Sequence, residues 1–210
     1  MDAGEYWLLD SVVESRDSLA MLVSNDIETA FNKRSHGLTR DQLIDVLERL
    51  FLGGDLLAHR WEKSGLKEFF IPTRTDIEEA FNGRVRCFYG LTSQGGARWE
   101  EVSQPHWERY IHDSVYAEPR EGEIIGSDRD LVEQYDSLSR YDSDISVVPG
   151  SEHWDVLRPW QATYWKELPA GHRLRYKYEW VGRTPEPKTD PKILEWFKEI
   201  HNWYTPYSGS

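Results

Sequence analysis

Histidine is a frequent metal ligand and general base, and it occurs seven times in this chain of 210 residues. A helical zinc site needs two histidines four residues apart, and no histidine pair has that spacing. The closest cluster of ligand types is His106, His112 and Asp113, near an expected domain junction. We interpret this cluster as chance proximity along the chain and expect no bound metal.

Two pairs of closely spaced carboxylates are the other candidates for cation binding. Asp128 with Asp130, and Asp142 with Asp144, could hold a divalent cation through their oxygens. Simpler roles are available for both, because Ser127 and Asp128 suit a helix start, and Asp142-Ser143-Asp144 suits a turn. We expect structural roles for both pairs.

The sequence contains no Gly-x-Ser-x-Gly elbow, no phosphate-binding loop and no dinucleotide fingerprint. Gly95 and Gly96 precede Trp99 and more simply permit close helix packing. The single cysteine, Cys87, lies beside Phe88 in an expected strand, which favours a buried structural thiol over a nucleophile. The sequence therefore predicts a protein that is not an enzyme and that carries no cofactor.

Binding chemistry is densest between residues 154 and 166, where Trp and Tyr alternate with basic residues. These residue types dominate the energetic hot spots of protein interfaces. We take six of them as candidate protein-binding residues: Trp154, Arg158, Trp160, Tyr164, Trp165 and Lys166. The alternative is that the second half of the chain needs these rings for its own core.

The charge balance limits which partners the chain can bind. It carries 25 basic and 37 acidic residues, a net charge of −12, and the acidity is spread over both halves. Such a field repels nucleic acid and anionic membranes and favours a basic partner. The alternative is that acidity only keeps the protein soluble. The N-terminus lacks the pattern of a secretory signal, so we expect a cytoplasmic protein that does not bind membranes.

The first half reads as an ordered series of short elements. Thr39 and Gln42 have capping-box spacing and open an amphipathic helix that runs to Leu52. The series continues with a strand over 55–61, a polar turn, the apolar run 69–71, a helix over 75–81 and a return strand over 84–91. A further helix follows to Val102.

This order over residues 24–102 resembles the winged helix-turn-helix of MarR- and PadR-type bacterial regulators. The resemblance rests on Leu38-Thr39-Arg40-Asp41-Gln42-Leu43, on the run from Leu47 to Leu57, and on Tyr89-Gly90-Leu91-Thr92. It implies that the helix at 39–52 enters the DNA major groove and that a wing over 60–86 touches the backbone. The DNA-contacting candidates are then Arg40, Arg60, Lys63, Lys67, Arg84 and Arg86.

The charges within this region depart from that pattern. Affinity for DNA comes largely from Lys and Arg neutralising phosphates. The polar face of the expected recognition helix sets Arg40 and Arg49 against three acidic residues, Asp41, Asp45 and Glu48. These charges favour a protein-interaction module or a purely structural module over DNA binding for this domain.

The second half reads as a smaller mixed domain. Residues 174–181 alternate apolar and charged side chains with a period of two, which predicts a strand with one buried face. A helix over 128–138, shorter strands around it and a final helix from Pro191 complete the pattern. We therefore predict an α+β protein with a winged-helix-like domain over 1–116 and a small α+β domain over 117–210.

The leading functional hypothesis is a non-enzymatic, intracellular protein-binding module, of inhibitor or immunity type, that engages a basic partner. The alternative is a DNA-binding transcriptional regulator of winged-helix type. The sequence leaves the partner's identity and the oligomeric state open.

Overall fold

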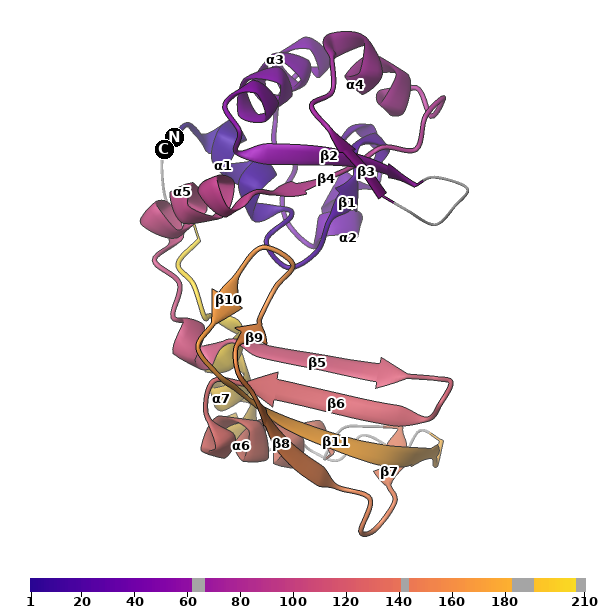
Figure 1. Ribbon diagram of the computed structural model, residues 1–210, viewed down its shortest axis with the longest axis vertical. Helices are drawn as coiled ribbons and strands as arrows, with labels where there is room; N and C mark the ends of the chain where they lie inside the picture. Colours follow the sequence, from indigo (N-terminus) through magenta and orange to yellow (C-terminus); the bar gives the residue numbers. More distant parts are fainter. Residues whose placement is uncertain (62–66, 141–143, 183–190, 207–210) are drawn as a thin grey trace. The chain divides into compact units, whose positions relative to one another are not determined.

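The computed structural model describes residues 1–61, 67–140, 144–182 and 191–206 (Figure 1). The chain forms two compact units. The first contains Met1–Ser103, Thr163–Lys166 and Pro206, and the second contains Gln104–Ala162 and Glu167–Thr205. Among the described residues there are seven α-helices and three antiparallel sheets, so the expected α+β class is confirmed.

The first unit is built on a four-stranded antiparallel sheet with the order β1-β4-β2-β3. Strand β2 is central, because Ala58 lies opposite Phe70 of β3 on one edge and Tyr89 of β4 on the other. The elements, in chain order, are α1 (Ala3–Asp10), β1 (Asp17–Ser18), the 3-10 helix η1 (Leu19–Val23), α2 (Ile27–Phe31), α3 (Arg40–Leu52), β2 (Leu56–Trp61), β3 (Lys67–Phe70), α4 (Arg74–Phe81), β4 (Phe88–Leu91) and α5 (Ser93–Ser103).

Helix α3 forms as its sequence predicts. The Thr39 hydroxyl accepts a hydrogen bond from the Gln42 amide at 3.4 Å, and the Gln42 side chain accepts one from the Thr39 amide at 2.9 Å. This reciprocal pair is the capping box expected from the spacing. The apolar face of the helix, which includes Leu47 and Phe51, is buried in the unit.

In two other helices the observed start differs from one that capping-box spacing alone could suggest. Helix α4 is capped by Thr73, whose hydroxyl accepts from the Asp76 amide, and not by Thr75, because the helix begins at Arg74. Helix α2 begins at Ile27, and its N-cap residue Asp26 makes no side-chain capping bond. Capping spacing recurs in polar sequence, so the same pattern fits several starting residues.

The paired glycines of α5 are sites of close approach, as the sequence suggests. A Cβ on Gly95 would lie 2.0 Å from the Asp55 carbonyl oxygen, and one on Gly96 would lie 2.0 Å from the Trp165 ring. Trp165 is fixed there because its indole N–H donates to the Val13 carbonyl at 2.8 Å. A side chain at either glycine would displace these neighbours.

The second unit is organised around the long strand β11 (Gly171–Trp180). One edge of β11 pairs with β6 (Glu121–Gly126), which pairs in turn with β5 (Ile111–Tyr116). The other edge pairs with β8 (His153–Leu157) and then β7 (Ile145–Val147). The remaining elements are the 3-10 helix η2 (Trp107–Arg109), α6 (Arg129–Ser139), the two-stranded sheet of β9 (Trp160–Gln161) and β10 (Glu167–Leu168), and α7 (Pro191–His201).

The core of this unit lies between the sheet and its two helices. Side chains from α6 and α7 meet alternate residues of β11. The buried cluster contains Ile124, Val132, Tyr135, Leu174, Tyr176, Tyr178 and Ile200. The period-two pattern in the sequence therefore arises because one face of β11 is covered by helices and its other face carries charged side chains.

The first continuous stretch of the first unit ends at Ser103. The next strand, β5, belongs to the second unit, and the sequence pattern does not predict it. Its middle residue on the core side is Asp113, which accepts a hydrogen bond from the Tyr135 hydroxyl at 3.0 Å. A carboxylate at that position hides the alternation from a hydropathy pattern.

No helix among the described residues is long and apolar enough to cross a membrane.

We predict that Gly96→Ala lowers the free energy of unfolding by about 1–3 kcal/mol, because a methyl group would overlap the Trp165 ring. The penalty should shrink in a Trp165→Ala background, where the space is empty. Urea unfolding of the two single variants and the double variant measures this coupling. An equal Gly96→Ala penalty in both backgrounds would contradict the packing argument.

Candidate functional site

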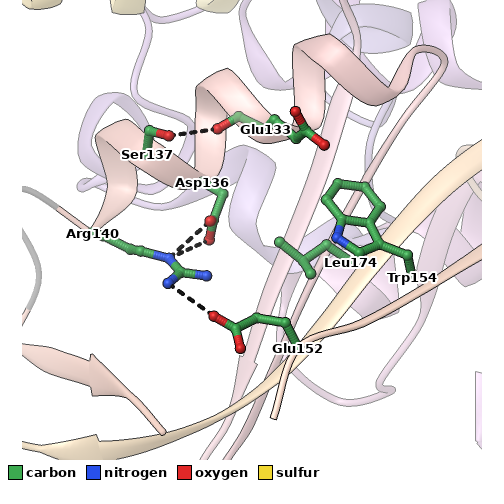
Figure 2. Close-up of a pocket in the computed structure, with 7 residues that line it drawn as sticks. All are labelled: Glu133, Asp136, Ser137, Arg140, Glu152, Trp154 and Leu174. Atoms are coloured by element: carbon green, nitrogen blue, oxygen red, sulfur yellow. Dashed lines mark hydrogen bonds and ion pairs between the residues drawn. The ribbon is translucent and has the colours of Figure 1, made fainter. Parts of the chain in front are cut away.

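A cavity of about 480 Å³ opens in the second unit between α6 and β8 (Figure 2). Its walls combine carboxylates, one guanidinium and two apolar side chains. The lining residues are Glu133, Asp136, Ser137, Arg140, Glu152, Trp154 and Leu174. Three carboxylates face one lining arginine, so the walls carry an excess of negative charge.

The helical wall follows from the period of α6. Glu133, Asp136, Ser137 and Arg140 have i, i+3, i+4 and i+7 spacing, which places them on one stripe of a helix. The buried Val132 lies on the stripe that faces the core. The helix thus presents its polar flank to the cavity while its apolar flank holds it on the sheet.

The cap of α6 differs from the expected one. The Asp128 carboxylate accepts a hydrogen bond from the Asp130 amide at 2.9 Å, which makes Asp128 the N-cap. Ser127 was expected there, but its hydroxyl donates to the Glu108 carbonyl at 2.8 Å. This hydrogen bond connects Ser127 to η2, the 3-10 helix that precedes β5.

The sheet wall is set by the register between β8 and β11. Trp154 lies directly opposite Leu174, so both side chains project from the same face of the sheet, toward α6. Leu174 is buried in the core cluster, and Trp154 packs against that cluster while remaining partly exposed. Trp154 therefore offers one part of its ring to the core and another to the cavity.

Arg140 joins the two walls. Its Nε atom donates to Asp136 at 2.8 Å, and a terminal nitrogen donates to Glu152 at 3.3 Å (Figure 2). The pKa of Glu152 is lowered mainly by a hydrogen bond from the backbone amide of Glu152 itself. The hydrogen bond from Arg140 lowers it further. The Glu152 carboxylate is consequently ionised at neutral pH.

A second arginine lies at the cavity rim. The Arg129 guanidinium carbon is 4.5 Å from the centre of the Trp154 ring, and its Nε atom donates to Glu133 at 2.8 Å. Cation, ring and carboxylate are thus assembled from side chains of α6 and β8. The cavity can chemically accept a cation, because it offers an aromatic ring together with carboxylates.

The six candidate protein-binding residues have different surroundings. Trp154 lines the cavity, Arg158 is exposed just after β8, and Trp160 is buried with its ring against Gly171. The other three belong to the first unit and bond to it. The Tyr164 hydroxyl donates to the Val12 carbonyl at 2.6 Å, and the Lys166 ammonium donates to Glu100 at 2.5 Å.

Sequence reasoning missed the rest of the cavity. The stripe from Glu133 to Arg140 was present as a polar face of an expected helix, and its i, i+3, i+4 spacing was a usable signal. Glu152 carried no such signal, because only the pairing of β8 with β11 brings it toward α6.

The DNA-contacting candidates have mixed surroundings. Arg40 donates to Asn82 at 2.8 Å, and Arg60 donates to Asp76 at 2.6 Å. Arg84 and Arg86 are exposed in the segment between α4 and β4. The backbone of Lys67 lies in β3, its side chain is outside the described part, and all of Lys63 lies outside the described residues.

The suspected metal ligands have other contacts. The His106 ring bonds to Glu108 at 2.9 Å, and the His112 ring bonds to Ser114 at 3.0 Å. Within the described ranges no group of three or more His, Cys, Asp or Glu side chains is placed to hold a metal ion. Asp142 lies outside those ranges.

Comparison of the chain with protein-family models, with curated proteins and with solved structures gives no match in any of the three. The cavity's own geometry is therefore the basis for a functional proposal.

We predict that Cys87 is unreactive in the folded protein. The residue is 1% exposed, and burial is the main cause that raises the pKa of its thiol to about 11. Thiolate is the reactive form, so a thiol reagent at pH 8 should label the protein only after denaturation. Rapid stoichiometric labelling of the native protein would contradict this burial.

Proposed function

We propose that this chain is a non-enzymatic protein-binding module that engages a basic partner through the cavity between α6 and β8. A role of inhibitor or immunity type suits this chemistry. The observation that carries the proposal is the lining of the cavity, which combines the Trp154 ring with the carboxylates of Glu133, Asp136 and Glu152. Carboxylates attract a cation, and an aromatic face holds it by its quadrupole.

The charge of the whole chain supports the same partner. With 37 acidic residues against 25 basic ones, the protein's field draws a basic protein toward it and raises the association rate. The cavity would then select one cationic side chain of that partner. In this proposal the net negative charge of the chain speeds the encounter with the partner. The Trp154 ring and the cavity carboxylates make the specific contact.

A second feature supports a macromolecular partner over a small cation. Tyr116 is 49% exposed and Trp180 is 56% exposed, at the end of the sheet where β5 and β11 finish. Both contact Tyr178, because its hydroxyl donates to the Tyr116 carbonyl and its ring lies 5.5 Å from the Trp180 ring. Exposed rings of this kind are frequent anchors of protein interfaces.

DNA binding is the alternative, and with it the winged-helix arrangement of residues 24–102. The exposed Arg84 and Arg86 are the observation in its favour. Against it, the helix α3 carries carboxylates that engage the neighbouring Arg74, which bonds to Asp45 at 2.6 Å and to Glu48 at 3.0 Å. A surface with that many acidic groups repels phosphates.

We predict that Trp154→Leu and Glu152→Gln each weaken binding of a Lys- and Arg-rich peptide by about three- to thirtyfold, because each removes one attraction for a cation. Leucine keeps apolar volume against the core. Titration calorimetry in low salt measures the affinity. Glu101→Gln is the matched control, since Glu101 is exposed, lies in the first unit and makes the same charge change.

Equal losses in the cavity variants and in Glu101→Gln would show only general electrostatic attraction, and would overturn the cavity as the site. No binding by the unaltered protein at about 50 mM salt would overturn the proposal altogether, because attraction between opposite charges is strongest there.

For the alternative, we expect no measurable affinity for a mixed-sequence DNA duplex at about 50 mM salt, where phosphate contacts are strongest. Fluorescence anisotropy of a labelled duplex provides the measurement. Binding that weakens steeply with salt and is lost in Arg84→Ala/Arg86→Ala would favour the regulator and count against the protein-binding proposal.

A further inference from the structure

The rim of the cavity already holds a cation that belongs to the chain. Arg129 is the first residue of α6, and its guanidinium lies over the Trp154 ring while donating to Glu133 one turn further on. Both charged side chains are about half exposed, at 54% and 51%. The guanidinium of Arg129 therefore covers one face of the Trp154 ring while remaining open to solvent.

The same arrangement occurs a second time at this cavity. Arg140 lies 5.8 Å from the centre of the Tyr176 ring and donates to Asp136 and Glu152. In both places a guanidinium meets an aromatic ring and at least one carboxylate. A planar guanidinium can stack on a ring while its edge N–H groups donate to carboxylates, whereas a compact ammonium cannot do both in this way.

The two arginines are not held equally. Arg140 is 35% exposed and bonds to two carboxylates, of which Asp136 is only 13% exposed. Arg129 is 54% exposed, and its ion pair with Glu133 is a surface pair of i, i+4 type. Pairs of that exposure contribute little to stability, so Arg129 can leave its place at small cost while Arg140 remains.

We propose that the cationic group taken by the cavity is the guanidinium of a partner's arginine, and that Arg129 occupies its place on Trp154 in the free protein. This inference rests on the proposed function and names the group that the same site recognises. An incoming arginine would stack on Trp154 and bond to Glu133, and Arg129 would swing into solvent. Arg129 is then an internal competitor that weakens binding.

The test uses two octapeptides that differ only in their cation, one of alternating Arg and Gly and one of alternating Lys and Gly. The unaltered 210-residue chain is compared with Arg129→Ala and with the control Arg109→Ala. Arg109 is an exposed arginine of η2 in the same unit, so its loss makes the same charge change. The indole N–H signal of Trp154, assigned through Trp154→Phe, reports on the site by NMR.

We expect Arg129→Ala to bind the arginine peptide about three- to tenfold more tightly than the unaltered protein, because a competitor for the ring is gone. Arg109→Ala should gain less than about twofold, which measures the general charge effect alone. The arginine peptide should bind Arg129→Ala at least about fivefold more tightly than the lysine peptide, and it should shift the Trp154 signal. Adding Glu133→Gln should remove most of the gain.

Three results would overturn the inference while leaving the proposed function in place. These are an equal gain in Arg129→Ala and Arg109→Ala, equal affinity for the two peptides, or binding that leaves the Trp154 signal unmoved. Failure of both peptides to bind any variant would overturn the proposed function and the inference together.

Discussion

The register of β11 is the constraint on which the second unit depends. This ten-residue strand pairs with β6 along one edge and with β8 and β7 along the other, so it fixes the position of every strand in the main sheet. It also places Leu174 opposite Trp154, which creates the sheet wall of the cavity. A slip of one residue would turn Tyr176 and Tyr178 to the charged face, and the core would lose its centre.

Ion pairs within each unit engage several of the chain's acidic side chains. Two half-buried arginines illustrate the pairing: Arg98 bonds to Asp55 and Glu5, and Arg173 donates to Asp155 at 2.8 and 2.7 Å. These pairs hold helices and strands together within each unit. Because acidic residues outnumber basic ones, carboxylates remain that no lysine or arginine of the chain can neutralise.

The sequence was sufficient for elements that a single local rule decides. The capping box at Thr39 marked α3, and the alternation over residues 174–181 marked most of β11. Local rules failed where a polar residue serves a distant partner, as Asp113 of β5 does for the Tyr135 hydroxyl. Part of the cavity lining could be predicted in the same way, because the polar stripe on α6 follows from local sequence spacing. Glu152 and Leu174 reach the cavity only through strand pairing, which the local sequence does not show.

The aromatic residues between 154 and 166 separate according to what each ring meets. The rings of Trp160 and Trp165 lie against Gly171 and Gly96, positions where any side chain would overlap them. Trp160 is buried, and Trp165 also donates its indole N–H to the Val13 carbonyl, so both rings are part of the packing. Trp154 instead meets a guanidinium and an open cavity, so part of its ring is available to a ligand. Composition alone gives all three residues the same weight, and it is the neighbouring residue, glycine or arginine, that distinguishes a ring that packs from a ring that can bind.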